Sequence, residues 1–364
     1  AAAPMTAAGA TKAEALDRAE EAQDAVAPTK PIHFADLLRA ELFPTMFSGM
    51  HATSMIQQLF WMAASPRFRD LLIYDHAAAF DEARDLQFAA TTFVCPGQFA
   101  YVGYRGTDTT LTGWREDFNM AFTMPVPAQD LAVEYLETVA NQTHLPEKLY
   151  VVGHSKGGNL AEYAALRCST DVQERIECVY NLDGPGFKAD TFASGDYAPL
   201  EGRLVKVVPE ESLVGIMLES EAPVFVAMSS ARGLDQHSAF TWEINEELSD
   251  FVYLPKLPEA TKATARTLHA WLSGYDDAER EEIVDAFFQA IEVSHAQNPI
   301  DILNGGARGL SLILEASRKI DRSTRRILVS AARSFVKALS ENTDGSLGAA
   351  AGAITDLANR IAPE

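Results

Sequence analysis

The segment that most constrains the fold of this 364-residue chain is KLYVVGHSKGGNLAEYAA, residues 148–165. It opens with an apolar run typical of a buried strand and continues into a helical pattern from about Gly157 to Cys168. Between the two lies G-x-S-x-G, with Ser155 at its centre. A serine on such a tight strand-to-helix turn has a strained backbone and an exposed Oγ, and the glycines let neighbouring chains approach closely. The segment therefore predicts a nucleophile at Ser155.

Other short β-branched and aromatic runs alternate with helical stretches along the middle of the chain. The four runs between Lys148 and Met228 are apolar on both faces. Strands that are covered by helices on each side have this pattern. Strand, helix and strand in this order favour a parallel sheet. We therefore predict an α/β-hydrolase fold: a mostly parallel central sheet flanked by helices, with helical N- and C-terminal extensions. The predicted strands are Ala89–Cys95, Phe99–Tyr104, Lys148–Val152, Cys178–Leu182, Leu204–Val208 and Val224–Met228.

Composition divides the chain into three parts. Residues 1–30 contain few large apolar side chains, which predicts a disordered or loosely helical tail. Residues 31–254 form the predicted α/β-hydrolase domain, and apolar residues at three- and four-residue spacing predict a helical lead-in over 31–88. Residues 255–364 are charged and amphipathic, which predicts a helical C-terminal extension.

A serine nucleophile needs a general base, and in this fold the base is a histidine that follows both the serine and the acid in the chain. His237 follows the last predicted strand through a glycine-containing loop, where the base is expected. His269 lies in a helical pattern and His295 lies between helices. His154 stands inside the motif, and its ring has to point away from the Oγ of Ser155. We therefore assign the base to His237.

The acid that orients the base has two candidate positions. Asp183 ends the strand CVYNL and precedes a Gly-Pro-Gly turn, and the carboxyl ends of parallel strands face the active-site crevice. Glu210 and Glu211 end the next strand and are the alternative. The residues alone leave this choice open.

Acyl transfer also needs hydrogen-bond donors for the developing oxyanion. One predicted donor is the backbone N–H of Lys156, which follows the nucleophile. The other is Thr107, in the loop after the strand FAYVGY, which offers a backbone N–H and a hydroxyl.

These motifs resemble those of the class 3 lipases, the fungal triacylglycerol type of α/β-hydrolase. The set RGTD, GWREDF, GHSKGGNLAEYAA, DGPGF and QHSAFTW is similar to that of a bacterial lipase-like family of unknown function. The resemblance covers residues 87–242, under half of the chain. It implies that Ser155 and His237 are nucleophile and base, that Thr107 belongs to the oxyanion hole, and that Trp114 has a packing role.

The related lipase families differ in the position of the triad acid, and this chain differs from them in the residue after the nucleophile. LDGPGF is similar to the LDPA segment of pancreatic lipases, whose aspartate is the triad acid, which implies Asp183. Class 3 lipases take the acid from the following strand end, which implies Glu210 or Glu211. Lipases usually carry leucine after the nucleophile, whereas this chain carries Lys156. A cation beside the acyl site favours an anionic or polar substrate over a triglyceride.

Charge and cysteine content limit the partners and the compartment. Fifty-one acidic against thirty basic side chains give a net charge of −21, which repels phosphate backbones, so no nucleic-acid partner is expected. The basic stretch from Arg318 to Arg326 is interpreted as a solvated helix face. The longest apolar runs stay well short of a membrane span and the start lacks a secretory signal. Three cysteines without CxxC spacing favour free thiols and a cytoplasmic location.

The leading interpretation is a serine hydrolase that cleaves a small-molecule or lipid carboxylic ester through an acyl-enzyme. The same residues would serve a thioesterase or an acyltransferase. A third interpretation is a catalytically silent scaffold that binds protein partners or self-associates through the C-terminal helices, although such a scaffold has no need of intact RGTD, GHSKGG and QHS elements. No cofactor or metal is expected, because neither metal-ligand spacing nor a phosphate-binding loop is present.

Overall fold

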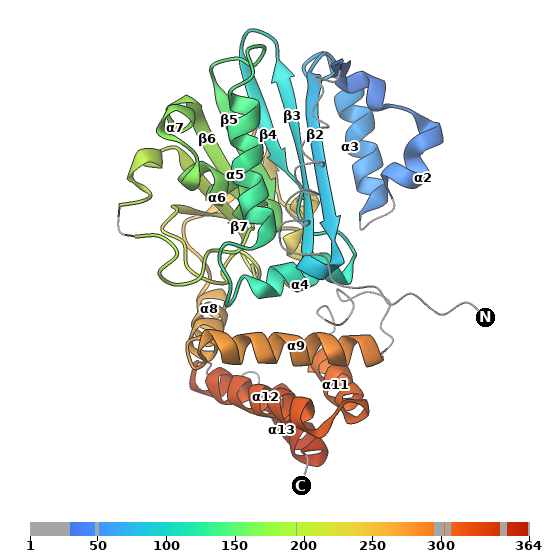
Figure 1. Cartoon of the computed structure of the whole chain (residues 1–364), viewed down its shortest axis with the longest axis vertical. Helices are drawn as coiled ribbons and strands as arrows, with labels where there is room; N and C mark the ends of the chain where they lie inside the picture. The colour runs from blue at the N-terminus through green and yellow to red at the C-terminus, as the bar shows by residue number, and fades with distance from the viewer. Residues whose placement is uncertain are drawn as a thin grey trace, which may run out of the picture.

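A nine-stranded sheet organises the part of the chain that the computed structural model describes (Figure 1). The strand order is β1-β2-β3-β4-β5-β6-β7-β8-β11. Strands β4 to β8 run parallel, and the strands on either side of them pair antiparallel. This is the predicted α/β-hydrolase fold. The strands of the sheet are β1 (Ile32–His33), β2 (Leu72–Asp81), β3 (Leu86–Cys95), β4 (Phe99–Tyr104), β5 (Leu149–His154), β6 (Ile176–Leu182), β7 (Leu204–Pro209), β8 (Val224–Ala227) and β11 (Tyr253–Leu254).

The structure describes most of the chain from Lys30 onward. The predicted tail lies outside it apart from Lys30, and so does His295. The described residues are 30–47, 51–193, 195–294, 302, 307–342 and 348–362.

The core forms where helices α5 (Pro127–Ala140) and α6 (Lys156–Arg167) pack on the central strands. Leu136 of α5, Leu149 of β5 and Leu160 of α6 are each fully buried. The predicted helix after the G-x-S-x-G motif is α6, and it begins directly after Ser155. The core therefore fixes the strand, turn and helix that present this serine.

The predicted helical lead-in over residues 31–88 is wrong in its second half. Helices α2 (Phe43–Met46) and α3 (Ala52–Ala64) do form, but Leu72–Asp81 is strand β2. The segment DHAAAF favours a helix by intrinsic propensity. Its pairing with β3 along nearly its whole length overrides that preference, because the long antiparallel ladder satisfies the backbone hydrogen-bonding groups.

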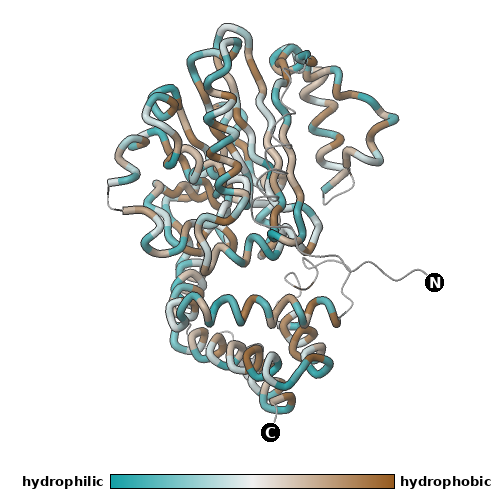
Figure 2. Tube along the Cα trace, in the orientation of Figure 1, coloured by the Kyte–Doolittle hydropathy of each residue, from teal (hydrophilic) through white to brown (hydrophobic). Residues whose placement is uncertain are grey.

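One helix of the sheet domain makes an apolar contact with the C-terminal helices. Trp114 and Phe118 of α4 (Leu111–Asn119) join a buried cluster with Phe288 and Ile291 of α9. In Figure 2 these helices alternate between hydrophobic and hydrophilic residues, as amphipathic helices do. Helix α4 is thus held between the sheet and the extension. The C-terminal helices are α8 (Glu259–Leu272), α9 (Asp277–Ser294), α11 (Ala307–Ala316), α12 (Arg322–Asn342) and α13 (Gly348–Ile361).

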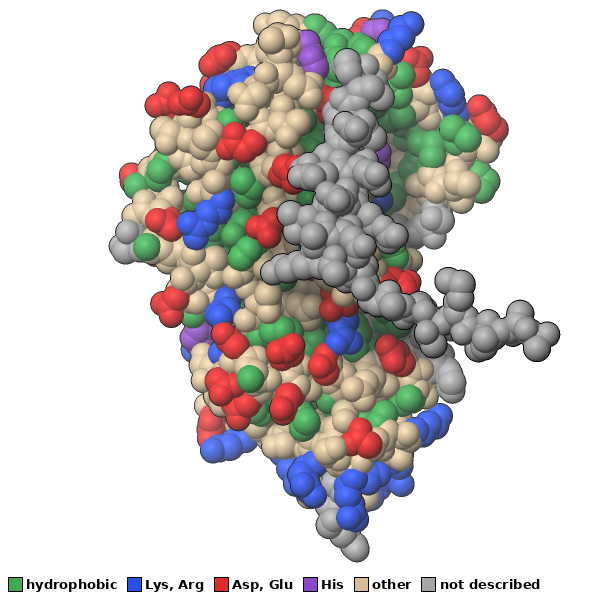
Figure 3. All heavy atoms as spheres, viewed as in Figure 1, with side chains coloured by type: hydrophobic (Ala, Val, Ile, Leu, Met, Phe, Trp, Pro, Cys, Tyr) green, Lys and Arg blue, Asp and Glu red, His purple; other side chains and the backbone are tan. Residues whose placement is uncertain are grey.

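Charge is unevenly distributed on the face that Figure 3 shows. Lysine and arginine side chains gather at the end of the molecule where α12 and α13 lie, and acidic side chains are spread over the rest of that face. Arg318, Lys319, Arg322 and Arg326 of the basic stretch are exposed, as expected for a solvated helix face, whereas Arg325 is half-buried.

Candidate active site

Ser155 has the backbone geometry of a nucleophile elbow. Its φ of 58° and ψ of −132° lie outside the regions that a side-chain-bearing residue usually adopts, and it immediately precedes α6. The Ser155 N–H donates to the carbonyl of Leu182 on the neighbouring strand (2.9 Å), and the Ser155 carbonyl accepts from Gly158 (2.9 Å). The strained turn is thus held by both the sheet and the helix.

The flanking glycines are required by close backbone contacts. A Cβ on Gly153 would lie 2.0 Å from the carbonyl oxygen of Gly157, and a Cβ on Gly157 would lie 2.2 Å from that of Tyr104. Gly106, in the loop after β4, sits directly against the elbow, because a Cβ there would lie 3.3 Å from the Cβ of Ser155. The loop that carries Thr107 therefore packs on the serine.

The structure brings His237 and Asp183 together across 54 residues of sequence. The Nδ1 of His237 lies 2.7 Å from the Oδ2 of Asp183. The other carboxylate oxygen, Oδ1, accepts from the Ser212 hydroxyl (2.6 Å) and the Gly215 N–H (3.1 Å). Asp183 is fully buried, whereas a quarter of the His237 side chain is exposed. A buried carboxylate with both oxygens occupied can hold the imidazole in one orientation.

Three further contacts fix the loop that carries His237. The buried Gln236 side chain accepts from the Glu211 N–H (2.9 Å), and Trp242 donates to the Gln236 carbonyl (2.8 Å). The Nε2 of His154 lies 2.6 Å from the His237 carbonyl oxygen. Burial lowers the pKa of His154 to about 4, and the nearby His237 ring acts in the same direction. His154 is therefore neutral at pH 7 and can donate its ring N–H to that carbonyl.

The two glutamates considered as alternative acids do not contact His237. The Glu211 carboxylate accepts from the Gly233 N–H (2.6 Å) and pairs with Arg232 (3.1 Å). These contacts, the Gly233 N–H first, lower the pKa of Glu211. The Glu210 carbonyl accepts from the Thr261 hydroxyl (2.6 Å). Glu211 thus anchors the start of the loop that leads to His237.

The expectation that Lys156 places a cation beside the acyl site is wrong. Its ammonium is buried and donates to the Gln87 carbonyl (2.7 Å), the Gln87 side chain (2.9 Å) and Glu116 (2.8 Å). Glu116 is equally buried and also accepts from the Gln87 and Ala128 N–H groups. The side chain of Lys156 therefore ties α6 to α4 and β3, and only its backbone N–H remains for an oxyanion.

Thr107 has a partner that sequence reasoning missed. Its hydroxyl donates to the Oδ2 of Asp117 (2.5 Å). The Oδ1 of Asp117 is inaccessible to solvent and has no hydrogen-bond partner among the described residues. Burial raises the pKa of Asp117 to about 6, although Lys156 and the Thr107 hydroxyl act in the opposite direction. With its hydroxyl engaged, Thr107 offers an oxyanion its backbone N–H.

The only signal for the missed residues was the acidic pair in GWREDF, which lies between the aromatic residues Trp114 and Phe118. Trp114 of the same motif packs in the cluster with α9, in line with its implied role.

Three broader expectations can be compared with the described residues. No group of three or more His, Cys, Asp or Glu side chains within them could hold a metal ion. Each helix in those ranges is too short or too polar to cross a bilayer. The cysteines are free thiols, but only Cys168 is fully buried, whereas Cys95 and Cys178 are half-buried.

A family model described as Mbeg1-like matches residues 62–289. The match reaches from α3 into α9 and so extends beyond residue 254. Two solved lipase structures are also similar to the chain. The structure of M37 lipase is 17% identical and covers 50% of this chain and 69% of its own, with a TM-score of 0.33. A fungal lipase–inhibitor complex is 16% identical and covers 54% and 74%, with a TM-score of 0.33. No curated protein matches the chain.

Proposed function

The chain belongs to the Mbeg1-like family, and from that premise we propose that it is a serine hydrolase that cleaves a carboxylic ester through an acyl-enzyme on Ser155. The observation that carries this proposal is the 2.7 Å contact between His237 and the buried Asp183, on the same sheet edge as the strained Ser155 turn. A structural turn has no need of an orientated imidazole.

In the proposed mechanism, Asp183 accepts the Nδ1–H of His237, which leaves Nε2 as the base. Nε2 takes the proton of the Ser155 hydroxyl as Oγ attacks the carbonyl carbon. The backbone N–H groups of Lys156 and Thr107 stabilise the oxyanion. His237 then gives its proton to the leaving alcohol, and a water attacks the acyl-enzyme with the same histidine as base.

Two features of the site support the oxyanion assignment. Within the described residues, neither the Lys156 N–H nor the Thr107 N–H donates a hydrogen bond, so both remain available. Gly106 places the Thr107 loop against Ser155. Removal of one such donor typically lowers turnover by about 10²–10³-fold in other hydrolases.

The surroundings of Lys156 bear on the charge of the substrate. Because the Lys156 ammonium is buried in an ion pair, it gives no reason to favour an anionic substrate. We propose an uncharged ester as substrate. The free thiols support a reducing, cytoplasmic compartment as part of the same proposal.

A panel of p-nitrophenyl esters of graded chain length, with acyl-thioesters of matching length, tests this function. We expect ester turnover by the wild-type chain and background rates for Ser155→Ala. A preference for thioesters would change the leaving group but keep the nucleophile. Equal rates for the wild type and Ser155→Ala on every substrate would contradict the proposal.

A further inference from the structure

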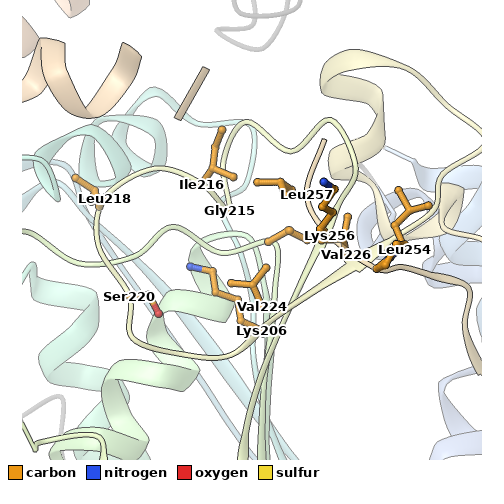
Figure 4. A pocket seen from close by; sticks show the side chains of 12 residues that line it. Lys206, Gly215, Ile216, Leu218, Ser220, Val224, Val226, Leu254, Lys256 and Leu257 are labelled. Atoms are coloured by element: carbon orange, nitrogen blue, oxygen red, sulfur yellow. The ribbon is translucent and has the colours of Figure 1, made fainter. Parts of the chain in front are cut away.

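A cavity lies next to the segment that holds Asp183. Its volume is about 300 Å³, and it is formed by β7, β8, the loop after β7 and the residues after β11 (Figure 4). Gly215 lines this cavity and also donates to Asp183. The volume is at the lower end of the range for small-molecule sites, which suits a single short chain.

The polar group of this cavity is the ammonium of Lys206. Lys206 is only 2% exposed, yet within the described residues it forms neither an ion pair nor a side-chain hydrogen bond. In Figure 4 its nitrogen points toward the loop that carries Ile216, Leu218 and Ser220. The Nζ of Lys206 is not among the solvent-inaccessible side-chain atoms that lack a partner in the described residues, so the ammonium is open to the cavity, where a ligand of opposite charge is favoured.

Apart from Lys256 and Ser220, the rest of the lining is apolar, and it contains no acidic residue. Lys206 and Lys256 are the charged residues of the lining, in a chain whose net charge is −21. The Ser220 hydroxyl already donates to Glu162 (2.8 Å), which leaves Lys206 as the buried donor. The apolar lining residues are Val208, Ile216, Leu218, Val224, Val226, Leu254, Pro255 and Leu257.

The loop that closes this cavity is held in one conformation. Gly186 donates to the Met217 carbonyl (2.8 Å), and Phe187 and Glu219 exchange two backbone hydrogen bonds. Leu218, between these anchors, has a φ of 62°, which is rare for a bulky residue. Strain of this kind persists only where the surroundings enforce it, and it is frequent at ligand sites.

We propose that this cavity binds a monocarboxylate with a short apolar chain, with Lys206 as the anchoring cation and the aliphatic side chains around the tail. One buried ammonium matches a head group of one negative charge better than a phosphate, which needs several donors. Burial lowers the pKa of Lys206, while Glu162 and Asp183 act to raise it. A ligand carboxylate within hydrogen-bond distance of Lys206 also acts to raise this pKa and so keeps the ammonium charged.

Isothermal titration calorimetry at pH 7 with sodium octanoate and octanamide tests this site on the full chain. The two ligands share a tail and differ in head-group charge. We expect the wild type to bind octanoate at least tenfold more tightly than octanamide, and Lys206→Met to bind both equally. Lys148→Met, which changes an exposed lysine paired with Glu177, is the matched control and keeps the preference. An octanoate preference that survives Lys206→Met would overturn the proposal.

Two further variants keep the test independent of folding and of catalysis. Ile216→Trp fills the cavity while it leaves Lys206 in place, and we expect it to abolish octanoate binding. If Lys206→Met does not fold, judged by far-UV circular dichroism, octanoate binding by a folded Ile216→Trp equal to that of the wild type overturns the proposal. Ser155→Ala retains octanoate binding, because the cavity does not depend on the nucleophile, so failure of the proposed hydrolase function and failure of this site remain distinguishable.

Discussion

Asp183 and Asp117 both lie close to the turn that presents Ser155, but their surroundings differ. Asp183 has partners for both oxygens: His237 on one, Ser212 and Gly215 on the other. Asp117 has Thr107 on one oxygen and, within the described residues, nothing on the other. A buried carboxylate oxygen without a donor favours the protonated form, and burial raises the pKa of Asp117 to about 6. The comparison separates a carboxylate with hydrogen-bond partners on both oxygens from one that can gain a proton near neutral pH.

We expect the largest effect from a substitution of Asp183. Asp183→Asn keeps the shape but donates toward Nδ1, which favours the wrong tautomer of His237. We expect turnover of the best ester to fall by about 10⁴-fold, as for the equivalent change in a serine protease, with little loss of structure. Steady-state kinetics and circular dichroism measure both.

The control for Asp183→Asn is Glu211→Gln, which changes the rival acid. We expect a far smaller loss, because Glu211 contacts Arg232 and Gly233 and not His237. A greater loss for Glu211→Gln than for Asp183→Asn would transfer the role of acid to the rival strand end.

The next largest effect concerns the buried ion pair between Lys156 and Glu116. Lys156→Met leaves Glu116 charged and buried without its cation, which we expect to cost about 3–5 kcal/mol in the free energy of unfolding. Urea denaturation measures this. Lys148→Met breaks an exposed pair and should cost only about 0–1 kcal/mol. Similar losses for the two variants would contradict the structural role given to Lys156.

We expect the smallest effect in the pH dependence of stability for a substitution of Asp117. The pKa of Asp117 in the folded protein, about 6, lies above the ordinary aspartate value of 3.8, so the folded state binds the extra proton and loses stability as pH rises from about 4 to 6. Asp117→Asn resembles the protonated form at every pH. Its unfolding free energy relative to the wild type should therefore rise by roughly 1–2 kcal/mol between pH 4 and pH 7, less than the full shift because the residue is partly exposed. A pH-independent difference would place the Asp117 pKa in its ordinary range.

The sequence predicted the parts of the molecule that local patterns determine. The strand-turn-helix around Ser155 was predictable, because its glycines and apolar runs are contiguous. Strand β2 was not, because an alanine-rich segment becomes a strand only through its pairing with β3. The fold class and the lipase-like resemblance are confirmed, whereas the identity of the acid stays a prediction that favours Asp183 over Glu210 and Glu211.

The side chains around the candidate site were harder to predict than its backbone. Lys156 follows Ser155 in sequence, but the first turn of α6 directs its side chain into the interior, where it contacts Glu116 of α4. Asp117 approaches Thr107 only because α4 packs between the sheet and α9. The Lys156–Glu116 contact joins residues 40 apart in the chain, and the Thr107–Asp117 contact depends on the packing of α4, so no local sequence pattern records either contact.

The measurement that tests the central claim most directly is labelling with a fluorophosphonate probe, followed by mass spectrometry of the peptides. Such probes react with a serine only when a neighbouring base activates its hydroxyl. We expect one adduct, on Ser155, that is lost in Ser155→Ala and strongly slowed in His237→Ala. Labelling that persists in Ser155→Ala, or a folded wild-type chain that takes up no probe, would contradict the account.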